Sequence, residues 1–209
     1  MNLADELGNT ALHYAAELDD FDLVQRLLQN RAAPNSENKL GITPFHVAAK
    51  MCSKDVVNIL LQFGAIPKLD KKERSILHFA ALGGRIGVMD ILANIDPELE
   101  RVDSSGKSVL HYAAIGQKVN MVANLLPLLP KSFLNKTDKD GKTPLHYAAT
   151  NSFFLHFQKS SKKSAEIEIS RNGVFENEQQ SAAICDIFLQ NGASVEIRDK
   201  NVILKNSLR

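Results

Sequence analysis

A nine-residue segment recurs five times in this sequence, and this repetition limits the possible folds more than any other property of the chain. The copies occupy residues 8–16, 41–49, 73–81, 106–114 and 141–149. Their hydroxyl residues are separated by 33, 32, 33 and 35 positions and are Thr10, Thr43, Ser75, Ser108 and Thr143. A motif that returns at one such interval predicts a stack of similar units, each burying apolar surface against its neighbours.

Within each copy, the residue types predict the start of a helix. The threonine or serine can accept a hydrogen bond from a backbone N–H group that the first helical turn leaves unpaired. Pro44 and Pro144 follow two of these hydroxyl residues, at the first helical position, where a missing N–H costs nothing. The paired alanines that end each copy allow neighbouring helices to approach closely. We therefore expect five equivalent first helices.

A second apolar stretch follows four of the copies and predicts a second helix. Apolar residues there recur at the i, i+3 and i+4 spacing of a helix with one buried stripe, in residues 21–28, 55–61, 88–92 and 121–126. Gly64 and Gly192 are expected as left-handed helix stops. Pro127 and Pro130 predict an early end of the second helix in the fourth copy.

The recurrent segments resemble the Thr-Pro-Leu-His-x-Ala-Ala core of the ankyrin repeat over most of the chain. The resemblance implies an all-α ankyrin-repeat solenoid of stacked helix-turn-helix units with β-hairpin fingers. We expect one domain over residues 1–209, with repeats at about 5–37, 38–69, 70–102, 103–137 and 138–198. Ala11, Ile76 and Val109 stand where the family has proline, and Glu73 replaces the turn glycine of the third repeat. These departures affect local turns and leave the expected fold unchanged.

The fifth repeat is interrupted by about 28 extra residues, within roughly 150–180. Residues 165–170 alternate like a short strand, and Arg171, Asn172 and Gly173 are expected to form a turn. Such an insertion is either disordered or passively packed, or it is a specific binding loop. The second helix is expected to resume over residues 183–193. Residues 199–209 begin a sixth finger. We expect them either to form a terminal cap or, as the preferred interpretation, to begin a further repeat of a longer protein from which this sequence was cut.

Composition narrows the classes of function. The 25 basic and 24 acidic residues give a net charge of +1, which does not favour nucleic acid as a partner, and we expect no membrane insertion. The two cysteines, Cys52 and Cys185, form no Cys-x-x-Cys pair, so we expect a reducing cytoplasm or nucleus. No phosphate-binding loop or hydrolase motif occurs, so we expect no cofactor, metal or catalytic residue. The resemblance implies that each motif histidine ties adjacent fingers through the backbone: His13, His46, His78, His111 and His146.

The resemblance also implies that variable finger and first-helix positions face a ligand. In the second to fifth repeats these positions are mainly basic, with Asp140 the acidic member, whereas Glu6, Asn9 and Glu17 make the first repeat acidic or polar. The predicted partner-binding residues are these cations and two aromatic residues of the insertion: Lys39, Lys50, Lys71, Lys72, Arg74, Lys107, Lys139, Lys142, Phe153 and Phe154. A basic strip of this kind would attract a partner with an acidic surface.

We therefore expect a monomeric, non-catalytic module that binds another protein through its concave face, aided by the insertion in the fifth repeat. It could serve as a scaffold, an adaptor or the host-binding domain of a bacterial effector, in which case it would act in the host cytosol. The alternative is the targeting domain of a larger enzyme whose catalytic part lies beyond residue 209.

Overall fold

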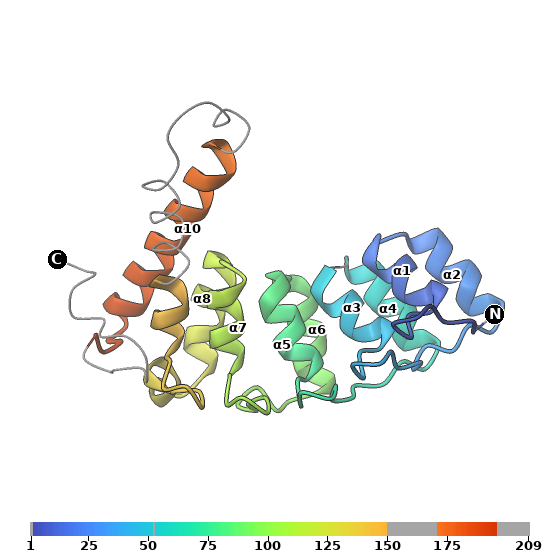
Figure 1. Ribbon diagram of the computed structural model, residues 1–209, viewed down its shortest axis with the longest axis horizontal. Coiled ribbons are helices and arrows are strands. Elements are labelled where there is room, and N and C mark those ends of the chain that lie inside the picture. Colours follow the sequence, from blue (N-terminus) through green and yellow to red (C-terminus); the bar gives the residue numbers. More distant parts are fainter. Residues whose placement is uncertain (1, 52, 150–170, 196–209) are drawn as a thin grey trace. The chain divides into compact units, whose positions relative to one another are not determined.

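The computed structural model describes residues 2–51, 53–149 and 171–195, and of residues 171–178 it describes only the backbone. The chain divides into two compact units, Met1–Ser105 (unit 1) and Gly106–Arg209 (unit 2). Unit 1 contains α1 (Ala11–Glu17), α2 (Phe21–Gln29), α3 (Pro44–Met51), α4 (Lys54–Gln62), α5 (Ile76–Gly83) and α6 (Ile86–Ile95) (Figure 1). Unit 2 contains α7 (Val109–Ile115), α8 (Val119–Leu125), the 3₁₀ turns η1 (Leu126–Leu128) and η2 (Lys131–Asn135), and α10 (Arg171–Gln190).

The first helices α1, α3, α5 and α7 begin immediately after the predicted hydroxyl residues. At Thr43, for example, the imidazole Nδ1 of His46 accepts the backbone N–H of Thr43 at 3.1 Å, and Thr43 Oγ1 accepts the backbone N–H of His46 at 3.4 Å. The same reciprocal cap is formed by Ser75 with His78 and by Ser108 with His111. The histidine thus takes the place of the acid or amide that usually completes a capping box.

The helix ends also agree with the predictions made from the sequence. Gly64 and Gly192 adopt φ angles of 83° and 92°, which confirms the two left-handed stops. Helix α8 ends at Leu125 and is followed by the short η1 and η2 turns around Pro127 and Pro130. Proline removes a backbone donor and clashes with the preceding turn, so the early end of this helix is confirmed.

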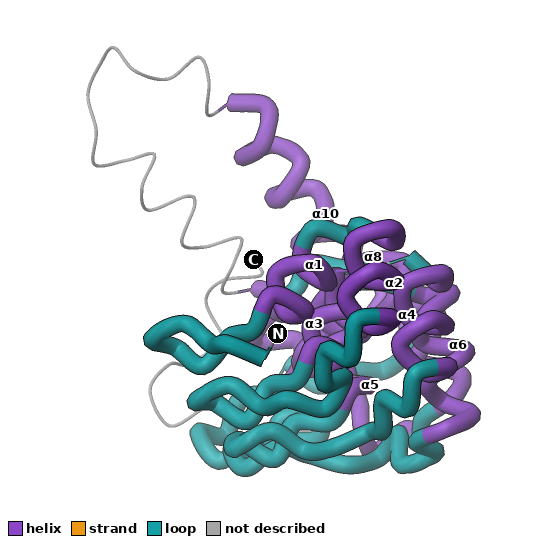
Figure 2. Tube along the Cα trace, turned by 90° about the vertical axis from the view of Figure 1, so that its right-hand side faces the viewer, coloured by secondary structure: helices purple, strands orange, loops and turns teal. Residues whose placement is uncertain are grey.

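In unit 1, the first helices form the inner layer of a stack, and the second helices cover them on the outer side (Figure 2). The paired alanines are fully buried, as in Ala48 and Ala49 of α3. Gly83 of α5 lies so close to α3 that an added Cβ would be 1.9 Å from the carbonyl oxygen of Lys50. Small residues therefore set the close helix–helix spacing of this stack, and large residues such as Phe45 and Leu60 fill the space around them.

Each finger turns at one aspartate or asparagine whose side chain organises the loop. Its Oδ1 accepts the backbone N–H two residues further on, as in Asp70 with Lys72 at 2.9 Å. The same contact is made by Asp5, Asn38, Asp103 and Asp138. In the described residues, however, the fingers form no β-strand, and the finger of the first repeat contains a single antiparallel bridge between Ala4 and Thr10. Regular β-hairpin fingers are therefore not confirmed.

Helix α10 occupies the place predicted for the second helix of the fifth repeat, with Ile184 and Phe188 fully buried. The turn predicted at Arg171, Asn172 and Gly173 is wrong, because α10 begins at Arg171 and continues for 20 residues. Residues 174–183 contain no proline and several strong helix formers, and the single glycine costs a helix only about 1 kcal/mol. The predicted strand at 165–170 lies outside the described residues.

Candidate functional site

The finger tips of unit 1 present three exposed lysines, Lys39, Lys71 and Lys72. Backbone hydrogen bonds hold these tips in register. The N–H of Lys39 donates to the Leu7 carbonyl at 2.9 Å, and the N–H of Lys71 donates to the Leu40 carbonyl at 3.0 Å. No ion pair engages these three side chains among the described residues. They form a fixed row of cations at the solvent edge of the fingers.

Arg74, also predicted in this row, is held in a different way. Its guanidinium donates to Asp70 Oδ2 from Nε at 2.7 Å and lies over the ring of Phe79, 4.6 Å from the centroid. Its side chain keeps only 16% of its surface exposed, and the Asp70 carboxylate is fully buried. The charge of Arg74 is therefore compensated within the protein, and its main effect is to fix the finger against α5.

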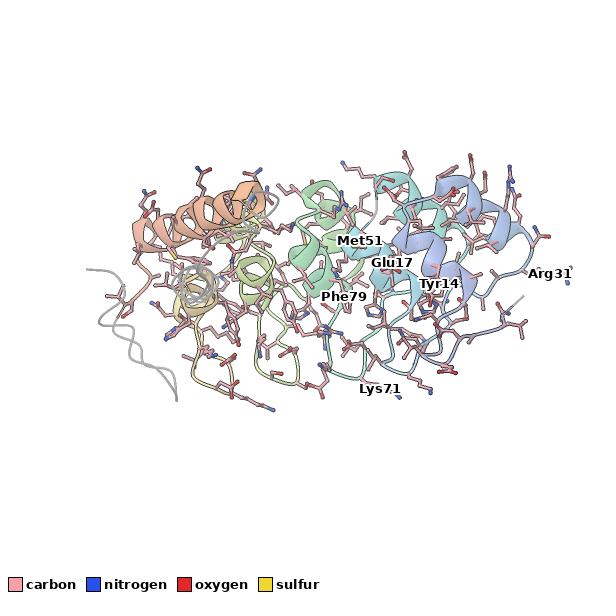
Figure 3. All side chains as sticks on the ribbon, turned by 45° about the horizontal axis from the view of Figure 1, so that its top comes forward. Tyr14, Glu17, Arg31, Met51, Lys71 and Phe79 are labelled. Carbon is pink, nitrogen blue, oxygen red and sulfur yellow. The ribbon has the colours of Figure 1, made fainter. Side chains whose placement is uncertain are left out.

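The first helices add large side chains beside the finger row. Tyr14 and Glu17 of α1, Met51 of α3 and Phe79 of α5 lie along the same side of unit 1, with Lys71 at the finger edge (Figure 3). Tyr14 is about half exposed, whereas Phe79 is almost buried. Lys50, the predicted site residue on α3, is partly exposed in the same helix turn as Met51. This side of unit 1 therefore combines aromatic and aliphatic surface with a cationic edge.

At the start of unit 1, Glu6 of the first finger and Glu17 of α1 give the acidic character that the sequence predicted, and both are exposed. The Tyr14 hydroxyl donates to Asp5 Oδ2 at 2.6 Å. This hydrogen bond lowers the pKa of the Asp5 carboxyl and raises the pKa of the Tyr14 phenol. Asn9 donates to the same carboxylate and accepts from Asn38, so it links the first two fingers.

In unit 2, the predicted cations gather around one tyrosine. The ammonium groups of Lys107 and Lys142 each lie 5.6 Å from the ring centroid of Tyr147. The Tyr147 hydroxyl donates to Asp138 Oδ2 at 2.6 Å, and Lys107 pairs with the same oxygen at 3.3 Å. Burial acts to raise the pKa of Asp138, but the hydrogen bonds and Lys107 hold it below its usual value overall. Lys139 is exposed at the finger tip.

The structure thus separates six of the eight predicted cations into two groups. Lys39, Lys71, Lys72 and Lys139 are exposed at finger tips, whereas buried carboxylates engage Arg74 and Lys107. The sequence interpretation missed Asp70 and Asp138 as partners of these cations, although the recurrence of aspartate at the same place in three successive repeats, at Asp70, Asp103 and Asp138, was a usable signal. It also omitted Glu73, which is exposed at the turn between Lys72 and Arg74. Phe153 and Phe154 lie outside the described residues.

In His13, His46 and His111, both ring nitrogens form hydrogen bonds. In His46, Nδ1 accepts the Thr43 N–H while Nε2 lies 3.0 Å from the Lys68 carbonyl, to which it donates as the neutral Nε2–H tautomer. Burial lowers the pKa of His13 and His46, so both side chains remain neutral near pH 7. His111 makes the same contact with the Lys142 carbonyl at 3.1 Å. These imidazoles join fingers through the backbone, as the resemblance implied.

Other features of the described residues give no sign of a reaction centre. No group of three or more His, Cys, Asp or Glu side chains there could hold a metal ion. Cys185 is buried, and burial raises the pKa of its thiol to about 11, so the reactive thiolate is disfavoured near pH 7. Within the described ranges, no helix combines the length and the apolar character needed to cross a bilayer. Cys52 lies outside them.

Unit 2 also contains an open groove of about 430 Å³ beside η1, η2 and α10. Its walls are mainly aliphatic and come from Leu110, Ala123, Leu126, Pro127, Leu129, Pro130, Lys131, Leu134, Ile187 and Asn191. Lys131 is the one ionisable residue of this lining. A groove with such walls offers apolar contact area but no pair of groups for acid–base or nucleophilic chemistry.

A family model described as ankyrin repeats, in three copies, matches residues 12–103 and 94–158. No protein with curated annotation matches the chain significantly. The two matched ranges together contain all five recurrent histidines and the paired alanines that follow them.

Proposed function

Because the chain belongs to the ankyrin-repeat family, we propose that it holds a partner protein on the finger and first-helix side of unit 1. Repeats of this family generally mediate protein–protein interaction, and the proteins that contain them are typically non-catalytic binding modules. In this role the chain acts as a scaffold or adaptor. The observation that carries the proposal is the fixed row of Lys39, Lys71 and Lys72 beside the side chains of α1, α3 and α5.

The two parts of this surface suit different contributions to binding. Tyr14 and Met51 offer large side chains that a partner can cover, and such aromatic and aliphatic anchors usually dominate the free energy of association. The lysines stand at the edge, where charges mainly steer encounter and select the partner. Their backbone positions are already fixed by the finger–finger hydrogen bonds, so little order is lost when a partner binds.

The charge of the row defines the chemistry of the partner. We propose an acidic segment that runs along the fingers next to an apolar side chain directed at Tyr14 and Met51. Arg74 is excluded from the direct contact set because Asp70 and Phe79 already engage its guanidinium. A screened, exposed interaction of this kind loses strength as salt concentration rises.

Site-directed photocrosslinking tests the location of the proposed surface. A photoreactive amino acid at Leu40, exposed on the second finger, is compared with one at Phe63, exposed after α4. Each purified variant is irradiated in cell lysate, and the adducts are identified by mass spectrometry. We expect one protein to crosslink from position 40 and not from position 63. Equal adducts from both positions would contradict a specific finger surface.

The crosslinked partner is then purified and its affinity measured at two salt concentrations. Reversal of two finger charges, Lys71→Glu with Lys72→Glu, is expected to weaken binding about tenfold and to reduce its salt dependence. The matched control reverses Lys54 and Arg85, which are exposed near the starts of α4 and α6. If both double variants bind like the parent chain, the lysine row is not part of the binding surface.

A further inference from the structure

The groove of about 430 Å³ in unit 2 lies where a proline interrupts the pairing of second helices. Counted from the hydroxyl residues of the two repeats, Pro127 occupies the position of Gln62, the last residue of α4. Because proline clashes with the preceding helical turn, α8 ends at Leu125. Helix α10 packs beside α8 (Figure 1) and continues to Gln190. The last turn of α10, with Ile187, therefore faces the 3₁₀ turns η1 and η2 across the groove.

The walls of this groove are held in place and keep apolar surface accessible. Leu129 and Leu134 line it as nearly buried side chains, whereas Ile187 is partly exposed. The side-chain carbonyl of Asn135 accepts the backbone N–H of Ser194 at 2.8 Å, which joins η2 to the chain just after α10. Because the two walls are already joined, little conformational freedom is lost when a partner binds. A partner that covers the apolar walls removes them from water, which stabilises the complex.

The charge of the groove is positive. Lys131, the ionisable residue of its lining, is exposed and forms no ion pair with a described residue. Residues 104–137 contain no aspartate or glutamate, so α7, α8, η1 and η2 contribute no acidic group to the walls. Asp186 of α10 is exposed but does not line the groove. An apolar groove that carries one uncompensated cation is complementary to an apolar segment that carries a carboxylate.

We propose that this groove binds an acidic amphipathic helix of a partner protein. Aliphatic side chains of the helix enter between η1 and Ile187, and a glutamate or aspartate pairs with Lys131. The groove is open, so one side of any occupant stays in water. An amphipathic helix turns its polar side outward there, whereas the chain of a fatty acid would leave apolar surface exposed. The site belongs to the second-helix layer and is separate from the lysine row on the fingers of unit 1.

The test uses two synthetic helical peptides that share one leucine stripe, flanked by glutamate in one peptide and by lysine in the other. Fluorescence anisotropy of the labelled peptides measures their binding to the 209-residue chain. We expect the glutamate peptide to bind about tenfold more tightly than the lysine peptide, and Lys131→Glu to remove this preference. Ile187→Gln is expected to weaken binding of the glutamate peptide about tenfold, because it places a polar group on the apolar wall. The matched controls are Lys118→Glu, at the opposite end of α8, and Leu189→Gln, exposed on α10 outside the lining.

Circular dichroism melting first confirms that the variants are folded, and Lys131→Glu carries the test if Ile187→Gln is not, because Lys131 is exposed. Equal affinity for both peptides, or equal losses in the variants and their matched controls, would overturn the proposal. Binding of the glutamate peptide only after Ile203→Asp would replace the partner by residues 196–209 of the chain itself. Self-association that Ile187→Gln abolishes would replace it by a second copy. The Lys71→Glu/Lys72→Glu variant should bind the glutamate peptide normally, so this proposal and the proposed function can fail independently.

Discussion

The finger layers of units 1 and 2 are built alike, whereas their second helices differ. His46 reaches the Lys68 carbonyl at 3.0 Å in unit 1, and His111 reaches the Lys142 carbonyl at 3.1 Å in unit 2. The outer layer of unit 1 contains helices of nine and ten residues, α4 and α6. In unit 2 this layer combines α8, which ends before Pro127, with the 20-residue α10.

This difference indicates which layer specifies the repeat. Fingers and first helices depend on hydrogen bonds with fixed geometry between named side chains and backbone groups, so each copy needs the same residue types. Second helices contribute mainly apolar area, and many sequences of suitable pattern can supply it. Gln117, which accepts the Ser181 hydroxyl at 2.6 Å, gives α10 one specific polar anchor in addition to its apolar contacts.

The largest expected effect tests whether α10 carries the outer layer of unit 2. Phe188 is fully buried, and Phe188→Ala is expected to lower the free energy of unfolding by about 4 kcal/mol, because a large core side chain leaves a cavity. Urea denaturation followed by circular dichroism measures the change. Leu189→Ala, partly exposed on the same helix, is the control and should cost far less. A cost below about 1 kcal/mol for Phe188→Ala would show that α10 is not part of the core.

The second test addresses the histidine contacts of unit 1 through pH. Burial lowers the pKa of His13 and His46 in the folded protein, while unfolded histidine keeps a pKa near 6.5. The unfolded state therefore binds more protons at mildly acidic pH, and the free energy of unfolding should decrease as pH falls below about 6.5.

Urea midpoints recorded between pH 8 and pH 5 measure this dependence. The variant His46→Gln cannot take up the proton, so it should be less stable at pH 8 but should lose less stability on acidification. A midpoint that stays constant or rises toward pH 5 in the parent chain would contradict the buried neutral histidines.

The smallest effect concerns one finger turn. Glu73 adopts φ of 59° where other fingers place glycine, such as Gly41 at 76° and Gly141 at 80°. A left-handed backbone costs a residue with a side chain about 1–2 kcal/mol. Glycine removes this cost but also gives the unfolded chain more conformational freedom, which opposes folding. Glu73→Gly is therefore expected to raise the free energy of unfolding by up to about 1 kcal/mol. Thermal melting of the variant and the parent chain measures this change in stability. The reverse comparison is Gly41→Ala, whose Cβ would meet the Lys71 nitrogen at 2.8 Å and should destabilise.

Local sequence signals were sufficient for most of the helices. Hydroxyl residues, paired alanines and the glycine and proline stops act within a few positions, so the bounds of α3, α5 and α8 could be predicted closely. The turn at Arg171 was predicted wrongly because a local asparagine–glycine signal was weighted above the helix-forming residues that follow. The sequence has no local feature that links Lys107 to Asp138, since these residues meet only when successive fingers stack.

The candidate site was predictable in part for the same reason. Finger positions follow from the repeat, so Lys39, Lys71 and Lys72 were placed at exposed tips as expected. Arg74 keeps little exposed surface because the Asp70 carboxylate and the Phe79 ring engage its side chain. These contacts form only when the finger lies against α5. Family resemblance gives the position of such a residue, but not whether its charge is already neutralised.

The histidine contacts give the stack a polarity. His13 uses one nitrogen within its own repeat and the other on the Ile42 carbonyl, on the side of higher residue number. His46 and His111 point the same way along the chain. Deleting a repeat from the low-number end therefore leaves every remaining imidazole with its acceptor, whereas deleting from the opposite end removes the acceptor of the repeat before it. Shortening the array should thus be tolerated asymmetrically.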